Sequence, residues 1–118
     1  MTDSYSVCLK KAVHVFSAGH FITLRNDLCE AIHGHNWTVA CSASGAPDSH
    51  GMVIDFIVLR DTLSEIICQL DHSILLPTKN SCLDVTKQTH AGQDEVLVTF
   101  QDRRWVFPAD ECRLLPLV

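Results

Sequence analysis

Two histidines separated by one glycine, His33 and His35 in the sequence HGH, have a spacing that suits metal binding. Residues two apart on a strand point to the same side, so both imidazoles can reach one ion while Gly34 faces away. A third histidine, His20, ends an earlier apolar segment in the sequence FSAGH. If the two segments pair as antiparallel strands, the end of the first lies beside the start of the second, which brings His20 to the pair.

Three imidazoles without a fourth protein ligand are typical of a catalytic zinc site, because the open coordination position admits water or substrate. The sequence therefore predicts a Zn²⁺ ion bound by these three histidines. The competing interpretation is that they are ordinary polar residues at strand ends, which is the commoner case for any single histidine. The histidines at 14, 50 and 90 have no such partners in the sequence, and we interpret them as structural or surface residues.

Two predicted strands must position the three histidines. Residues 5–20 are rich in strand formers, and the pair Lys10 and Lys11 interrupts their alternation, which predicts a bulge or bend there. Residues 33–43 alternate cleanly, with an apolar odd-numbered face that begins at the two histidines. The residues between these segments, 23–32, are too many for a tight turn, so they predict a loop.

A helix is predicted after the second strand, with Asp55 as its N-terminal cap, and we interpret this aspartate as structural. Its apolar residues recur at alternating spacings of three and four and are Phe56, Leu59, Leu63, Ile66 and Leu70. Such a helix lies across a sheet and ends near Asp71 and His72. Residues 77–94 then predict a loop, because they are polar and begin with a proline.

The last 24 residues, from Glu95 onward, predict a hairpin with strands around residues 96–100 and 104–107, followed by one more strand-like run. A chain of 118 residues with 47% hydrophobic content predicts one core and a single domain over residues 1–118. The formal net charge of −5 argues against a nucleic-acid partner.

Targeting and redox features are scarce in the sequence. We find no signal-peptide pattern and no apolar run near the roughly 20 residues that cross a bilayer, so we expect a soluble, cytoplasmic protein without a membrane partner. The six cysteines are scattered without Cys-x-x-Cys spacing, and we expect reduced thiols rather than disulfides.

Four motifs stand in the order FSAGHF, CEAIHGHNW, GMVIDFIVLR and LDHSILL. In order and spacing they resemble the family of 6-pyruvoyl-tetrahydropterin synthases and 6-carboxytetrahydropterin synthases. The resemblance implies an α+β subunit of the T-fold (tunnelling-fold) type, with an antiparallel sheet packed by a helix. It also implies a homo-oligomer, a trimer or hexamer in full-length form, whose subunits join their sheets into a barrel.

The resemblance covers residues 1–77, whereas residues 78–118 look like a divergent loop and an inserted hairpin. The chain stops where the family places a Pro-Thr-x-Glu-like motif, a second helix and the last strands. Glu95 and Glu111 do not stand in a matching motif. We therefore expect either a C-terminally truncated protein or a pterin-anchoring glutamate from another source.

In function, the resemblance implies a zinc lyase that acts on 7,8-dihydroneopterin triphosphate. It implies zinc at the three histidines, a catalytic Cys29, and Asp71 and His72 as a pair that completes the proton transfers. The spacing Cys-x-x-x-His-Gly-His is similar to that of the bacterial enzymes of the queuosine pathway, which release acetaldehyde and triphosphate and form 6-carboxy-5,6,7,8-tetrahydropterin. A 6-pyruvoyl-tetrahydropterin synthase, which eliminates triphosphate only, and a non-catalytic pterin- or metal-binding module remain alternatives.

The residue types suit this chemistry. A hydroxyl bound to zinc loses its proton easily, because the cation stabilises the alkoxide. A cysteine near a cation and a histidine is expected to have a pKa below its ordinary value of about 8.5, which would make Cys29 a usable base. Asp71 is expected to orient His72 and favour its protonated form. On residue type alone, an inert loop cysteine and a simple helix cap are the commoner cases.

Overall fold

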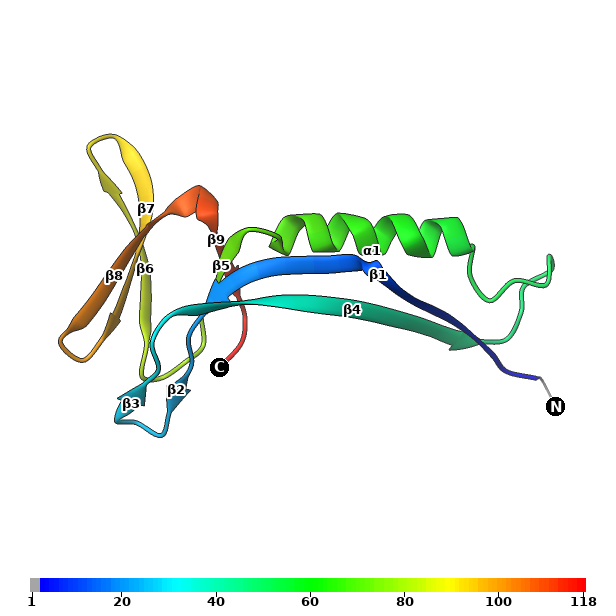
Figure 1. The fold of residues 1–118 in the computed structure, drawn as a ribbon, viewed down its shortest axis with the longest axis horizontal. Helices are drawn as coiled ribbons and strands as arrows, with labels where there is room; N and C mark the ends of the chain where they lie inside the picture. Colours follow the sequence, from blue (N-terminus) through cyan, green and yellow to red (C-terminus); the bar gives the residue numbers. More distant parts are fainter. Residues whose placement is uncertain (1–2) are drawn as a thin grey trace. The chain divides into compact units, whose positions relative to one another are not determined.

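The computed structural model describes residues 3–118 (Figure 1). Its elements are β1 (Tyr5–His20), β2 (Thr23–Leu24), β3 (Leu28–Cys29), β4 (His33–Gly45), α1 (Phe56–Leu70), β5 (Ser73–Pro77), β6 (Asp84–His90), β7 (Gln93–Phe100), β8 (Arg103–Pro108), η1 (Ala109–Glu111) and β9 (Cys112–Leu115). No helix within residues 3–118 is long and apolar enough to cross a membrane.

Within residues 3–118 the strands form three sheets, in the orders β4-β1-β5-β9, β2-β3 and β6-β7-β8. The α+β class is confirmed, but the expected antiparallel sheet also contains parallel pairings. β5 pairs in parallel with both β1 and β9. Parallel neighbours need a long connection between them, and here α1 precedes β5 while the β6-β7-β8 sheet precedes β9.

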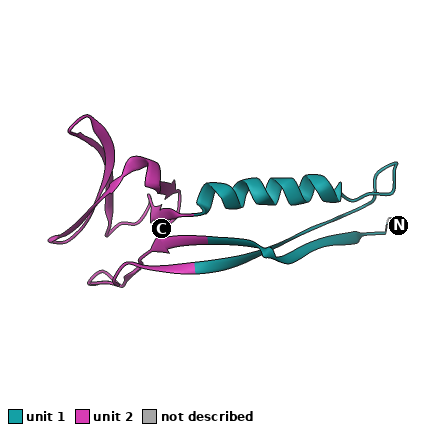
Figure 2. Cartoon of the chain, turned by 45° about the horizontal axis from the view of Figure 1, so that its top comes forward, with its two compact units in different colours: residues 1–16, 36–71 teal, residues 17–35, 72–118 magenta. Residues whose placement is uncertain are grey.

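Contacts divide the chain into two compact units, which Figure 2 shows in different colours. The first unit runs to Phe16 and resumes over Asn36–Asp71, and the second consists of Ser17–His35 and His72–Val118. Both β1 and β4 therefore begin in one unit and end in the other. The single domain over residues 1–118 stays a prediction.

In the first unit, α1 packs on β1 through Leu63 and Ile67, which are buried with Leu9. The helix begins as predicted, because the Asp55 carboxylate accepts the N–H of Ile57 at 2.8 Å. Along β1 the fully buried positions change from odd to even numbers between residues 9 and 14. This change agrees with the break in alternation that the lysine pair predicts.

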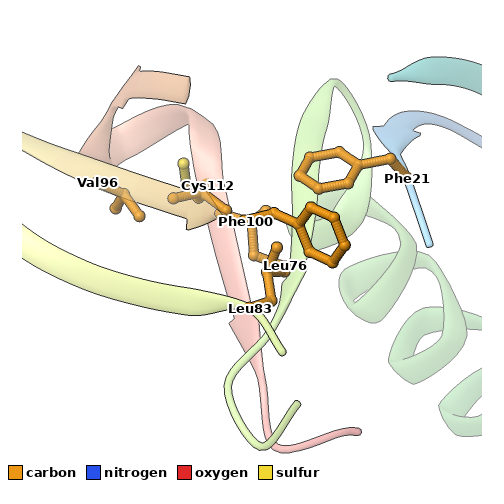
Figure 3. Packing of buried hydrophobic residues seen from close by; sticks show 7 residues of the cluster. Phe21, Leu76, Leu83, Val96, Phe100 and Cys112 are labelled. Carbon is orange, nitrogen blue, oxygen red and sulfur yellow. The ribbon is translucent and has the colours of Figure 1, made fainter. Parts of the chain in front are cut away.

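The second unit has its own core, and Figure 3 shows its side chains from close by. The buried members are Phe21, Leu76, Leu83, Val96, Val98, Phe100 and Cys112. β7 contributes three of them at every second position, as the alternation of its sequence predicts. The hairpin of β7 and β8 is confirmed, and so is the final strand β9.

Two predicted loops are wrong in part. Residues 23–32 contain the short hairpin of β2 and β3, which pairs Thr23 with Cys29. Residues 77–94 contain β6, which pairs with β7 along its whole length. The sequence of β6 lacks apolar alternation, and none of its residues is buried. Its strand conformation therefore depends on backbone pairing with β7. Ala91 and Gly92, both with positive φ, form the tight turn between the two strands.

Candidate metal centre

The three predicted ligands come together within the second unit. The ring centroids of His33 and His35 are 4.7 Å apart, and the centroid of His20 lies 4.8 Å from the first and 5.1 Å from the second. Their potential ligand atoms all lie within 4.8 Å of one another. No other group of at least three histidine, cysteine, aspartate or glutamate side chains within residues 3–118 converges in this way.

The ends of two neighbouring strands position these rings. His20 is the last residue of β1 and His33 is the first of β4, and β1 and β4 are adjacent in the sheet. The backbones approach closely here, since a Cβ placed on Gly34 would lie 3.6 Å from the carbonyl oxygen of Ala18. The predicted juxtaposition of the end of the first strand and the start of the second is confirmed.

His33 has a defined tautomer. Its Nδ1 lies 2.8 Å from the carbonyl oxygen of Ala31, which can only accept, so Nδ1 donates its proton there. The lone pair of a neutral His33 is therefore on Nε2, the nitrogen available to a metal ion. Nε2 also lies 3.8 Å from Oε1 of Glu30, and the two side chains are 38% and 31% exposed.

The electrostatics of the cluster favour a neutral ring at His20. Burial is the main cause that lowers the pKa of His20, and the neighbouring His33 and His35 lower it further, whereas Glu30 raises it. Neutral imidazole is the form that binds a metal ion. Three neutral nitrogen donors fit the preference of zinc, so the residues present suit the predicted ion.

Cys29, the predicted catalytic thiol, lies at the end of β3 and is half-buried against the core of the second unit. Burial raises the pKa of this thiol, Glu30 raises it further, and the guanidinium of Arg103 lowers it. Without a bound cation the net direction is therefore upward, whereas the expected lowering includes a cation beside the thiol. The cause is the packing of the side chain against apolar residues, which disfavours the thiolate.

Asp71 and His72 lie at the end of α1, as predicted. The backbone N–H of Asp71 caps the helix by donating to Ile67 at 2.9 Å, and the N–H of His72 donates to the carbonyl oxygen of Ser17 at 2.6 Å. His72 adopts a φ of 58°, which turns the chain from the helix into β5. Its backbone thus lies beside β1 three residues before His20, while its catalytic role stays a prediction.

The sequence analysis missed two side chains at this site, Glu30 and Arg103. Glu30 accepts the N–H of Ile22 at 2.9 Å in addition to its contact with His33. The feature of the sequence that could have indicated Glu30 is its position three residues before His33. Arg103 belongs to β8 and donates to the carbonyl oxygen of Cys29 at 3.2 Å. No local pattern could have indicated this contact, because 74 residues separate the two partners.

Comparison with known proteins gives consistent relatives. A protein of Archaeoglobus fulgidus, provisionally named a 6-carboxy-5,6,7,8-tetrahydropterin synthase, is 37% identical over 76 residues, which cover 59% of this chain and 65% of that protein. The 6-carboxy-5,6,7,8-tetrahydropterin synthase of Rickettsia bellii is 30% identical over 80 residues, which cover 66% of this chain and 58% of that protein. The chain thus matches less than two thirds of the length of these relatives.

Among solved structures, the 6-pyruvoyl tetrahydropterin synthase of Plasmodium falciparum superposes with a TM-score of 0.82 at 27% identity. The match covers 97% of this chain and 68% of the Plasmodium chain. The family model described as 6-pyruvoyl tetrahydropterin synthase matches residues 9–102, which extends past residue 77. With that match, the T-fold superposition and the histidine cluster in agreement, the chain belongs to the 6-pyruvoyl tetrahydropterin synthase family.

Proposed function

We propose that this chain belongs to a zinc-dependent lyase that converts 7,8-dihydroneopterin triphosphate to 6-carboxy-5,6,7,8-tetrahydropterin. The convergence of His20, His33 and His35 is the observation that carries the proposal. The names of the Archaeoglobus and Rickettsia relatives support the carboxy product. The spacing of Cys29 from the histidine pair, four residues before His33, supports it as well. The product would then enter the pathway to queuosine and related 7-deazapurines.

The three imidazoles would hold Zn²⁺, which supplies a Lewis acid that acidifies the side-chain hydroxyls of the substrate. Cys29 then serves as the base and acid at the pterin carbon. Burial raises the pKa of this thiol even with Arg103 nearby, so a Zn²⁺ ion held by the three imidazoles would have to favour the thiolate further. His72 transfers a proton at the substrate side chain, and Asp71 orients the imidazole ring of His72.

The neighbouring reaction is a second candidate, because the matching Plasmodium structures are named 6-pyruvoyl tetrahydropterin synthases. That reaction eliminates triphosphate and keeps the carbon skeleton intact. A non-catalytic pterin- or metal-binding module is a third candidate, since the chain matches only part of its curated relatives. For the active protein we propose a cytoplasmic homo-oligomer, a trimer or hexamer in full-length form, as the resemblance implies.

Product analysis separates these candidates. The zinc-loaded chain is incubated with 7,8-dihydroneopterin triphosphate, and acetaldehyde, triphosphate and pterin products are quantified. The proposed lyase releases acetaldehyde and triphosphate in equal amounts. Triphosphate without acetaldehyde would show the pyruvoyl reaction. Zinc binding without either product would show a binding module, and both outcomes would overturn the proposal.

A further inference from the structure

Arg103 links the three-stranded β6-β7-β8 sheet to the segment that carries the proposed catalytic thiol. It is the first residue of β8, and its Nη1 donates to the backbone carbonyl oxygen of Cys29 at 3.2 Å. Both residues belong to the second unit. A side chain from the hairpin, which we expected to diverge from the family, thus contacts the end of β3, four residues before His33.

The guanidinium of Arg103 also packs on an aromatic ring. It lies over the ring of Trp105, 4.9 Å from the ring centroid. Trp105 in turn stacks on Phe21, with centroids 4.7 Å apart and planes inclined by 26°. Phe21 is 4% exposed and directly follows the metal ligand His20. A continuous set of contacts therefore runs from the residue beside His20 to the backbone of Cys29.

We propose that Arg103 is a positioning residue for Cys29, holding the backbone of β3 at a fixed place relative to the three histidines. The inference rests on the proposed function, in which Cys29 moves protons. It adds the residue that orients the thiol and gives the β6-β7-β8 sheet a part in the site.

An arginine suits this place better than a lysine. A planar guanidinium stacks on an aromatic face and donates from its edge at the same time, whereas an ammonium is a compact point charge. The charge acts as well as the hydrogen bond. Arg103 lowers the pKa of the Cys29 thiol against the effects of burial and of Glu30. Arg103 and Glu30 are the charged groups that act on this thiol.

Arg104 provides a matched control. It follows Arg103 on the same strand, so its side chain projects from the opposite face of the sheet. It is exposed like Arg103, and it is not among the groups that shift the pKa of Cys29. Loss of its charge changes the net charge of the chain by the same amount as loss of Arg103.

The experiment compares Arg103→Gln, Arg103→Lys and Arg104→Gln with the unmodified chain. Alkylation of Cys29 by iodoacetamide is followed against pH by peptide mass spectrometry, with the exposed Cys68 as internal reference. Hydrogen exchange of the amides in β2 and β3 is measured in parallel. Both measurements are made on zinc-loaded and on chelator-treated protein.

For Arg103→Gln we expect alkylation of Cys29 at neutral pH to slow by about two- to fivefold, the effect of one exposed charge, with a profile shifted to higher pH. The β2-β3 amides should exchange faster. Arg103→Lys should restore the alkylation profile but not the slow exchange, and Arg104→Gln should match the unmodified chain. Arg103→Gln indistinguishable from Arg104→Gln in both measurements would overturn the inference.

These readouts are independent of turnover. A chain that makes no pterin product would overturn the proposed function and leave the role of Arg103 testable by alkylation and exchange. Conversely, an active chain in which Arg103→Gln changes neither readout would overturn this inference alone.

Discussion

His33 donates its Nδ1 proton to the carbonyl oxygen of Ala31 at 2.8 Å, which leaves the lone pair of the neutral ring on Nε2 for a metal ion. The tautomer of a metal-binding histidine is set by the partner of its second nitrogen. Here the partner belongs to the chain's own backbone, two residues earlier, so His33 is prepared for metal binding by the local path of the chain into β4.

Glu30 should strengthen metal binding, because its carboxylate lies 3.8 Å from Nε2 of His33. Its negative charge would attract a cation bound to that nitrogen. Glu30→Gln keeps an oxygen that can accept the N–H of Ile22 but removes the negative charge. We expect its zinc affinity to fall about tenfold, the lower end of the effect of groups around a metal site. Competition with a chromogenic chelator measures this, and an unchanged dissociation constant would contradict the assignment.

The metal-free chain should lose stability in mild acid through His20. Its pKa in the folded chain is lowered from the ordinary value of 6.5, mainly by burial, so the unfolded chain binds the proton more readily. The unfolding free energy should therefore fall as the pH drops through 6.5 toward the lowered pKa. Urea unfolding at several pH values should show a shallower dependence for His20→Gln, and an identical slope would exclude this residue as the cause.

Cys29 should matter for turnover but not for zinc binding. Because a positioned acid or base contributes about 10²- to 10⁴-fold to a rate, Cys29→Ala should reduce kcat by that factor while zinc content stays unchanged. Cys68→Ala, at an exposed cysteine on α1, is the matched control and should retain activity. Full activity of Cys29→Ala would refute the catalytic role, and loss of its zinc would reassign the thiol to the metal site.

Asp55 should stabilise the first unit without touching the metal. Removal of its cap on the N–H of Ile57 in Asp55→Ala should cost about 1 kcal/mol of unfolding free energy. Asp55→Asn retains a capping oxygen and should recover most of this loss. Urea unfolding measures both variants, and equal stability of alanine and asparagine at this position would disprove the cap.

Local patterns were sufficient for much of this fold. The alternation from His33 onward predicts β4, and the HGH spacing places two imidazoles on one face of it. The cap at Asp55 and the apolar spacing predict α1 over residues 56–70. These features depend on residues close in sequence, which is why the sequence alone specifies them.

Other features depend on partners far along the chain. β6 carries mostly polar side chains and becomes a strand because β7 pairs with it. The direction of the Cys29 pKa shift follows from burial against the core of the second unit, and the compensating charge comes from Arg103. Neither is visible in the residues around Cys29, since tertiary packing decides both.

The central claim is that three imidazoles share one ion, and metal analysis tests it most directly. Purified chain is loaded with zinc, passed over a desalting column and measured by inductively coupled plasma mass spectrometry. His33→Ala is compared with His90→Ala, an exposed histidine of β6 outside the cluster. We predict one zinc per chain for the unmodified protein and His90→Ala, and almost none for His33→Ala. Equal zinc in His33→Ala and His90→Ala would contradict the account.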